Sequence, residues 1–174
     1  MTSNERILSV SMYGAPNFGI MKEVIGDIFE SEEALCHCVS KDFKMNKGIA
    51  KVFRKKFKNT EQLKKSCTGV GGIAVIKHEG RYIYNLVTKD RYFQKPTYTN
   101  LKKSLKEMKE HAVKNGVDRI SMPKIGCGLD GLEWKIVKEI IKETFYECNT
   151  HITVFCLEES PKKRIKSNVN YREM

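Results

Sequence analysis

Hydrophobic and polar residues along the chain follow two periods, one typical of strands and one typical of helices. Short apolar runs bounded by glycine, proline or polar residues predict strands at 20–25, 34–39, 73–76, 82–87, 117–122 and 152–157. Apolar residues at helical spacing predict helices over 48–57, from Pro96 to Ala112 and from Leu132 to Phe145.

The alternation of strands and helices in the second half of the chain predicts an α/β fold. A mixed sheet with helices on both faces would bury the apolar side of each helix. The length of 174 residues suits one domain, and neither an internal repeat nor a linker divides the sequence. Residues 1–19 are polar and rich in turn formers, so we expect a loosely held leader there.

Charge and cysteine content narrow the partners and the compartment. The 32 Lys and Arg residues outnumber the 21 Asp and Glu residues, and the net charge of +11 favours anionic partners, although a solubilising surface would look the same. Six cysteines without the pairing pattern of a secreted scaffold, and the lack of a signal peptide or long apolar stretch, predict a reduced intracellular protein. The basic run 161–166 resembles a nuclear-import signal, or is a solvated tail.

Residues 126–131 combine three glycines with one acid between a predicted strand and a predicted helix. Glycines let a backbone approach closely and helix N-termini attract anions, so the loop suits phosphate, which Asp130 would repel unless it faced another part of the ligand. The loop also fits the dinucleotide pattern G-x-G-x-x-G, with Glu158 as the ribose acid, but the 16 residues after Glu158 are too few to complete that fold. A purely structural turn is the third interpretation.

Four polar or glycine-rich features directly follow predicted strands: Asp27, Ser40, Lys89 and the 126–131 loop. Ligands of α/β sheets bind at the carboxyl ends of strands, so we expect these features to converge on one crevice. Lys89 could be a solvated edge charge, a cation for phosphate or an amine nucleophile toward a sugar carbonyl.

Two cysteine-containing segments suggest other chemistry. A helix N-terminus would lower the thiol pKa of Cys127, but no motif places a histidine beside it, so a small packed residue is the favoured interpretation. In a strand, Cys36 and Cys38 share one face while His37 points away, and no second ligand pair follows at zinc spacing. We therefore expect no metal site.

Seven short stretches, in order along the chain, match a known family. They are GDIF at 26–29, HCVS at 37–40, GIA at 48–50, GRYIY at 80–84, LVTK at 86–89, KPTY at 95–98 and SMPKIGCGLD at 121–130. Together they resemble macrodomains, and most closely the branch of terminal ADP-ribose–protein glycohydrolases. The resemblance implies a three-layer α/β/α sandwich with a mixed central sheet over 20–157, flanked by a flexible leader (1–19) and a basic tail (158–174).

The resemblance also implies a crevice for ADP-ribose and a role for each matching residue. Asp27 would accept a hydrogen bond from the adenine, beside Ile28. The residues around the distal ribose would be Ser40, Gly48, Ile49 and Ala50. The residues around the diphosphate would be Gly126, Cys127, Gly128 and Leu129. Lys89 and Asp130 match the catalytic pair of this branch, which removes ADP-ribose from acidic side chains without a cofactor. Activity on O-acetyl-ADP-ribose is a related expectation.

Two other functions share part of this signal. A reader that binds ADP-ribose without turnover needs Asp27 and the glycine loop, whereas only an enzyme needs Lys89 with Asp130. A basic nucleic-acid binder would show steep salt dependence and no nucleotide-sized pocket. We favour a monomeric hydrolase of the nucleus or cytoplasm that acts on ADP-ribosylated proteins, with poly-ADP-ribose or ADP-ribosylated nucleic acid as further partners and no membrane. Asn46 and Lys47 depart from the family pattern, in which small residues are common at these positions.

Overall fold

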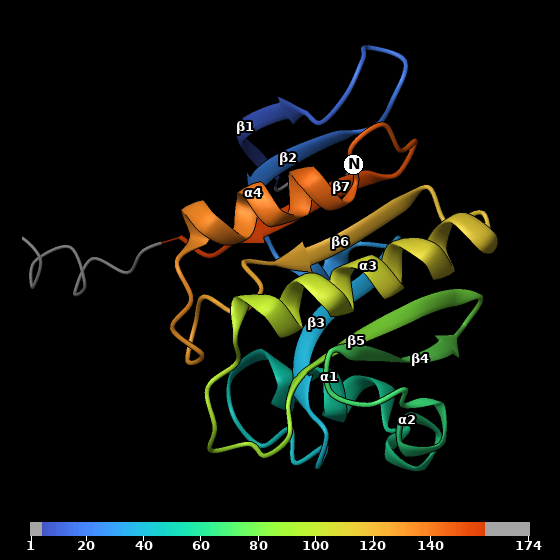
Figure 1. Ribbon diagram of the computed structural model, residues 1–174, viewed down its shortest axis with the longest axis vertical. Coiled ribbons are helices and arrows are strands. Elements are labelled where there is room, and N and C mark those ends of the chain that lie inside the picture. The colour runs from blue at the N-terminus through green and yellow to red at the C-terminus, as the bar shows by residue number, and fades with distance from the viewer. Residues whose placement is uncertain (1–4, 159–174) are drawn as a thin grey trace, which may run out of the picture.

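A computed structural model describes residues 5–158 and shows a seven-stranded sheet between two layers of helices (Figure 1). The strands are β1 (Arg6–Met12), β2 (Ile20–Ile25), β3 (Ala34–Ser40), β4 (Gly72–His78), β5 (Arg81–Lys89), β6 (Arg119–Pro123) and β7 (His151–Cys156). The helices are α1 (Gly48–Phe57), α2 (Thr60–Ser66), α3 (Tyr98–Lys114) and α4 (Trp134–Thr144), with a 3-10 turn, η1, at Ile28–Glu30. The predicted three-layer α/β/α architecture is confirmed.

The order of the strands in the sheet is β1-β2-β7-β6-β3-β5-β4. Strands β2, β7, β6, β3 and β5 run parallel, and one antiparallel strand closes each edge. The carboxyl ends of the parallel strands therefore lie at one edge of the sheet, where Ser40 at the end of β3 pairs with Lys89 at the end of β5 after a shift of register at Val39. The topology thus brings the strand-end residues to the same edge.

Each face of the sheet has its own hydrophobic core. On one face, α3 and α4 bury Leu101, Leu105, Met108, Val137 and Ile141 against the sheet. On the other face, α1 and α2 bury Phe53, Phe57 and Leu63. None of the helices within residues 5–158 is long and apolar enough to cross a bilayer.

The N-terminal segment contains a strand, so the prediction of a loosely held leader over 1–19 is wrong for residues 6–12. Strand β1 pairs antiparallel with β2 from Arg6 opposite Ile25 to Met12 opposite Ile20. It is an edge strand with one neighbour, its apolar side chains are about half exposed, and an irregularity between Ile7 and Ser9 interrupts its alternation. A strand that is half exposed and has an interrupted alternation of apolar and polar residues is therefore difficult to predict from the sequence. The predicted tail (158–174), including the run 161–166, lies outside the described residues except for Glu158.

Two helices differ from the prediction. The helix expected from Leu132 begins at Trp134, because the Leu132 amide donates to the Gly126 carbonyl at 2.8 Å and so belongs to the glycine loop. Helix α2 was not predicted; it has seven residues and only Leu63 buried, too little for a periodic apolar stripe. In α1, Phe53 and Phe57 are buried, whereas Val52 is exposed.

Candidate active site

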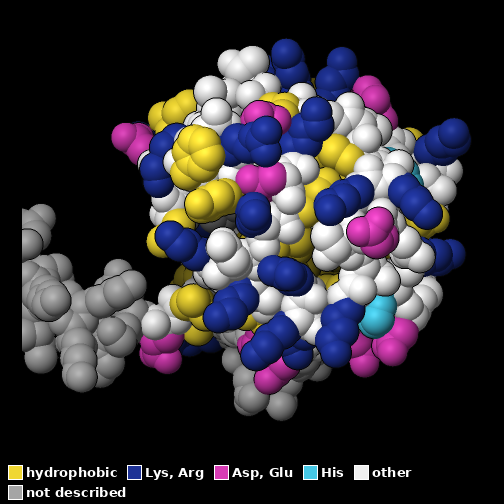
Figure 2. Space-filling view, turned by 90° about the horizontal axis from the view of Figure 1, so that it is seen from below, with side chains coloured by type: hydrophobic (Ala, Val, Ile, Leu, Met, Phe, Trp, Pro, Cys, Tyr) yellow, Lys and Arg dark blue, Asp and Glu magenta, His cyan; other side chains and the backbone are white. Residues whose placement is uncertain are grey.

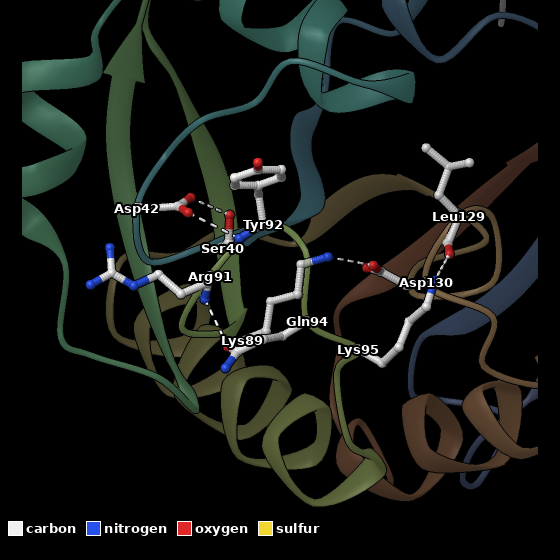
Figure 3. A network of polar contacts seen from close by, with 9 residues as sticks. All are labelled: Ser40, Asp42, Lys89, Arg91, Tyr92, Gln94, Lys95, Leu129 and Asp130. Atoms are coloured by element: carbon white, nitrogen blue, oxygen red, sulfur yellow. Dashed lines mark hydrogen bonds and ion pairs between the residues drawn. The ribbon is translucent and has the colours of Figure 1, made fainter.

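Lys89 and Asp130 form an ion pair at the carboxyl edge of the sheet (Figure 3). Lys89 is the last residue of β5, and its Nζ donates to Asp130 Oδ1 at 2.7 Å. The two side chains keep only 14% and 20% of their surface exposed. The structure therefore brings together an amine and a carboxylate that are 41 residues apart, in a partly desolvated setting where charged hydrogen bonds are strong.

Two contacts from residues 95–98, which lead into α3, hold the glycine loop and the residues directly after it. Lys95 Nζ donates to the Leu129 carbonyl at 2.5 Å, and the Tyr98 hydroxyl accepts from the Glu133 amide at 3.0 Å. Thr97 caps α3 by accepting from the Asn100 amide. The KPTY stretch of the sequence is thus a clamp for the loop that carries Asp130.

Two glycines of the loop, Gly126 and Gly128, differ in whether the fold itself requires a residue without a side chain. Gly126 has a left-handed backbone (φ +72°), and a Cβ there would lie 2.8 Å from Leu132 Cδ1. Gly128 does not have a left-handed backbone, and a Cβ at this position would meet no atom within 4 Å. Its open space is therefore not required by the fold, and it leaves the backbone accessible to a ligand.

Cys127 is a packed residue rather than an activated thiol. Its Sγ lies 3.3 Å from the Ile125 carbonyl, and burial raises the thiol pKa to about 11 despite the opposing charge of Lys124. The pKa-lowering effect expected of a helix N-terminus is not seen, because α4 starts seven residues later, at Trp134. The favoured interpretation, a small packed residue, is consistent with this environment.

Asp42 connects the turn after β3 to the loop after β5, and sequence analysis missed it. Its Oδ1 accepts from Ser40 Oγ at 2.6 Å and its Oδ2 accepts from the Tyr92 amide at 2.9 Å (Figure 3). Its Oδ1 also accepts from the Lys44 amide at 3.2 Å. Burial raises the pKa of Asp42, but these hydrogen bonds outweigh burial and leave the pKa below its usual value. Asp42 thus fixes two loops that flank Lys89.

The turn from residue 43 to residue 48 is held by its own side chains. Phe43, Met45 and Gly48 have left-handed backbones, and Phe43 and Met45 are buried in the core under α1. Met45, rather than the neighbouring Asn46, takes a positive φ in this turn. Core burial of two hydrophobic side chains stabilises a conformation that asparagine or glycine would adopt more easily.

The α1 turn and the glycine loop meet over the carboxyl edge. A Cβ on Gly48 would lie 3.4 Å from Leu129 Cδ1, so the tips of the two loops are in contact distance. Leu129 is 66% exposed, whereas Ile49 and Ala50 are half-buried behind the contact and Ser40 is buried. The residues expected around the distal ribose and the diphosphate therefore lie at adjoining loops.

Asp27 lies at the end of β2, on an exposed turn. Its Oδ1 accepts from the Phe29 amide at 2.9 Å and caps η1, while Ile28 packs into the core. Strands β7, β6 and β3 separate β2 from β5 in the sheet, so Asp27 lies toward the opposite end of the carboxyl edge from Lys89. An elongated ligand along this edge could reach both.

The Cys36–Cys38 segment has the geometry expected of a buried strand. Cys36 and Cys38 face the core under α3, while His37 points to the other face, stacks on Phe53 at 3.8 Å and bonds Asn85 at 2.5 Å. Burial lowers the pKa of His37 to about 4, so the ring is neutral at physiological pH. Within residues 5–158, no group of three or more His, Cys, Asp or Glu side chains is placed to hold a metal ion.

Comparison with known proteins identifies the family. The Macro domain family matches residues 36–141. The chain belongs to the macrodomain family. It is 48% identical over 136 residues to ADP-ribose glycohydrolase OARD1 of Homo sapiens and 49% identical to the Bos taurus protein, in each case over 77% of this chain and 90% of the relative.

Solved structures of macrodomains have the same fold. The macrodomain of Thermus aquaticus DarG is 28% identical, with a TM-score of 0.71 over 79% of this chain and 98% of that one. Thermosipho africanus DarTG in complex with ADP-ribose also has a TM-score of 0.71, over 83% of this chain and 44% of that one, but at 21% identity it is a likeness of fold alone. The family predicted from the seven stretches is confirmed.

Proposed function

We propose that this macrodomain is an ADP-ribose glycohydrolase that releases ADP-ribose from acidic side chains, with Lys89 as nucleophile and Asp130 as its acid–base partner. The observation that carries the proposal is the 2.7 Å contact between the Lys89 amine and the Asp130 carboxylate at the carboxyl edge of the sheet. The high identity to relatives named ADP-ribose glycohydrolase supports the same reaction class.

The chemistry needs an amine, a proton acceptor and an electrophilic carbon. In a glutamyl ester, the anomeric carbon of the distal ribose carries a carboxylate leaving group. The Lys89 amine attacks the anomeric carbon, and the C–O bond to the carboxylate breaks as the C–N bond of a covalent lysyl–ADP-ribose species forms. Asp130 takes the amine proton during attack and returns it when water releases the ADP-ribose, which regenerates the pair.

In this proposal, the other residues at the carboxyl edge bind the parts of ADP-ribose that do not react. Asp27 binds the adenine, the 45–50 turn and Ser40 line the distal ribose, and the amides of 126–129 hold the diphosphate. The charge of Asp130 then faces the ribose rather than the phosphates, which removes the repulsion expected from an acid in a phosphate loop. The exposed Leu129 side chain lies at the tip of the glycine loop and faces Gly48 of the turn that would line the ribose.

The test compares two lysines that each pair with a carboxylate. Lys89→Ala is expected to bind ADP-ribose in calorimetry but to release none from a glutamate-modified protein. Lys138→Ala, which breaks the 2.8 Å pair with Glu23, is the matched control and should retain turnover. Mass spectrometry of the wild type mixed with substrate should find an adduct on Lys89.

Two results would redirect the proposal. If Lys89→Ala keeps most of the hydrolytic rate, the lysine mechanism is wrong. If the wild type binds ADP-ribose and releases none from any ester, including O-acetyl-ADP-ribose, the domain is a reader. The nuclear or cytoplasmic location, the monomeric state and the further acceptors belong to the same proposal, and each needs its own measurement.

A further inference from the structure

The positive charge of the protein is concentrated in one short part of the chain. Residues 41–65 contain ten Lys and Arg residues and two acids, which is a net +8 out of the total of +11. This part comprises the turn after β3, α1 and α2. Figure 2 looks onto this end of the molecule, where Lys and Arg side chains outnumber Asp and Glu. A general solubilising charge would be spread over the surface, whereas this positive charge is concentrated at one end of the molecule.

A shallow hollow lies within this basic region. It has a volume of about 370 Å³ and is lined by Met45, Asn46, Lys51, Arg54, Lys55 and Lys58, with no acid among its lining residues. The four cations occur at helical spacings of three and four residues, so they form one row along α1. At 1.5 Å per residue, the row from Lys51 to Lys58 spans roughly 10 Å.

The row is partly fixed in position. Arg54 Nη1 donates to the Lys44 carbonyl at 3.1 Å, which anchors the guanidinium against the turn after β3. Phe53 and Phe57 of the same helix are buried in the core, so the backbone that carries the row is held against the sheet. The lysines are exposed and have no carboxylate partner in the ion pairs of residues 5–158.

We propose that this hollow is a docking surface for the phosphate backbone of a single-stranded nucleic acid, separate from the ADP-ribose crevice. A row of cations with no intervening acid, anchored at Arg54, matches the regular negative charge of such a backbone. Exposed aromatic residues occur on the neighbouring loop after β5, where Tyr92 and Phe93 are 44% and 70% exposed and available to stack on bases. The turn at Met45 and Asn46 joins the hollow to the predicted ribose subsite, so a docked strand lies beside that crevice.

The experiment measures binding of a fluorescent single-stranded oligonucleotide by anisotropy over a range of salt concentrations. The test variant is the triple substitution Lys51→Gln, Lys55→Gln and Lys58→Gln, which leaves the Arg54 contact intact. The matched control is Lys102→Gln, Lys103→Gln and Lys106→Gln on α3, which removes the same charge from the opposite face of the sheet. Both variants should bind ADP-ribose like the wild type, because neither changes the crevice.

The hollow variant should bind the oligonucleotide roughly tenfold more weakly at low salt, and its slope of log affinity against log salt should be shallower by about 2, since each single-strand phosphate contributes about 0.7. The control should change little, and saturating ADP-ribose should leave the oligonucleotide affinity within about twofold. If both variants lost the same oligonucleotide affinity, net charge alone would explain the effect. If ADP-ribose competed fully with the oligonucleotide, the strand would bind in the crevice. Either result overturns the proposal. So would a loss of poly-ADP-ribose or acidic-peptide binding without loss of oligonucleotide binding. Because no turnover is measured, an inactive protein would contradict the hydrolase proposal without affecting this test.

Discussion

Two lysine–carboxylate pairs of almost equal length lie in different surroundings. Lys138 and Glu23 are 2.8 Å apart between α4 and β2, and Lys89 and Asp130 are 2.7 Å apart between β5 and the glycine loop. All four side chains are a quarter exposed or less. Distance and burial alone therefore do not tell the two pairs apart.

The difference lies in the other donors around each carboxylate. Glu23 also accepts from Trp134 Nε1 at 2.7 Å and from the Ser9 hydroxyl, so it links β1, β2 and α4. Burial raises the pKa of Glu23, but the hydrogen bonds from Lys138, Ser9 and Trp134 outweigh burial and lower it. Among the side-chain hydrogen bonds of residues 5–158, Asp130 has only Lys89. A saturated carboxylate stabilises a fold, whereas one with free lone pairs can still take a proton.

The same amide substitution in both pairs should give the largest contrast. Asp130→Asn is expected to lower ADP-ribose release by about 10²–10⁴-fold, the usual contribution of a general acid–base group, with little change in melting temperature. Glu23→Gln should keep turnover. Steady-state assays on a glutamate-modified protein check both variants, and an active Asp130→Asn enzyme would remove the distinction drawn between the pairs.

The next largest effect is expected from substitutions in the glycine loop that carries Asp130. Gly128→Val should leave the fold intact, because a Cβ there meets no atom within 4 Å, and should abolish ADP-ribose binding by filling the space beside the loop amides. Gly126→Ala is the contrast: its left-handed backbone and the contact with Leu132 should cost thermal stability. Calorimetry and thermal unfolding separate the two outcomes. Normal binding by a folded Gly128→Val protein would place the diphosphate elsewhere.

Asp27 is a third carboxylate, and it is exposed; among the side-chain hydrogen bonds of residues 5–158, it accepts only from a turn amide. Asp27→Ala should weaken ADP-ribose binding by about 1.5–3 kcal/mol, since a charged acceptor for the adenine is lost. The melting temperature should fall only slightly, because the lost cap belongs to a single 3-10 turn. An unchanged dissociation constant would show that the adenine is bound by other residues.

The smallest effect is expected at the saturated pair, and on stability rather than on activity. Glu23→Gln should lower the free energy of unfolding by about 1–2 kcal/mol at neutral pH, because the neutral amide loses the charged part of its hydrogen bonds. A carboxyl with a lowered folded-state pKa contributes stability above its unfolded-state pKa and loses it as the pH falls through the folded-state value. Denaturant titrations should therefore show the gap between wild type and variant closing at acid pH. A constant gap would mean that charge is not the cause.

Sequence patterns predicted the central strands and the strand-end residues because both follow local rules. Buried parallel strands read as continuous apolar runs, and topology then brings residues such as Ser40 and Lys89 together. Strand β1 was not predicted, because its apolar side chains are half exposed. The role of Asp42 was not predicted either, because it depends on a hydrogen bond from the Tyr92 amide, fifty residues away. The start of α4 was also missed, because the contact between Leu132 and Gly126 is a loop interaction without a periodic signal.

The position of β7 has a consequence for synthesis of the protein. Among the strands of residues 5–158, the last to be synthesised, β7, lies inside the sheet between β6 and β2, and its Ile152 pairs with Met21, about 130 residues earlier in the chain. The β1–β2 hairpin can therefore join the rest of the sheet only after residue 156 has been made, and contacts so distant in sequence form slowly. Nascent chains that stall before β7 should expose the apolar edges of β2 and β6, and would be substrates for chaperones and proteases rather than partly active enzymes.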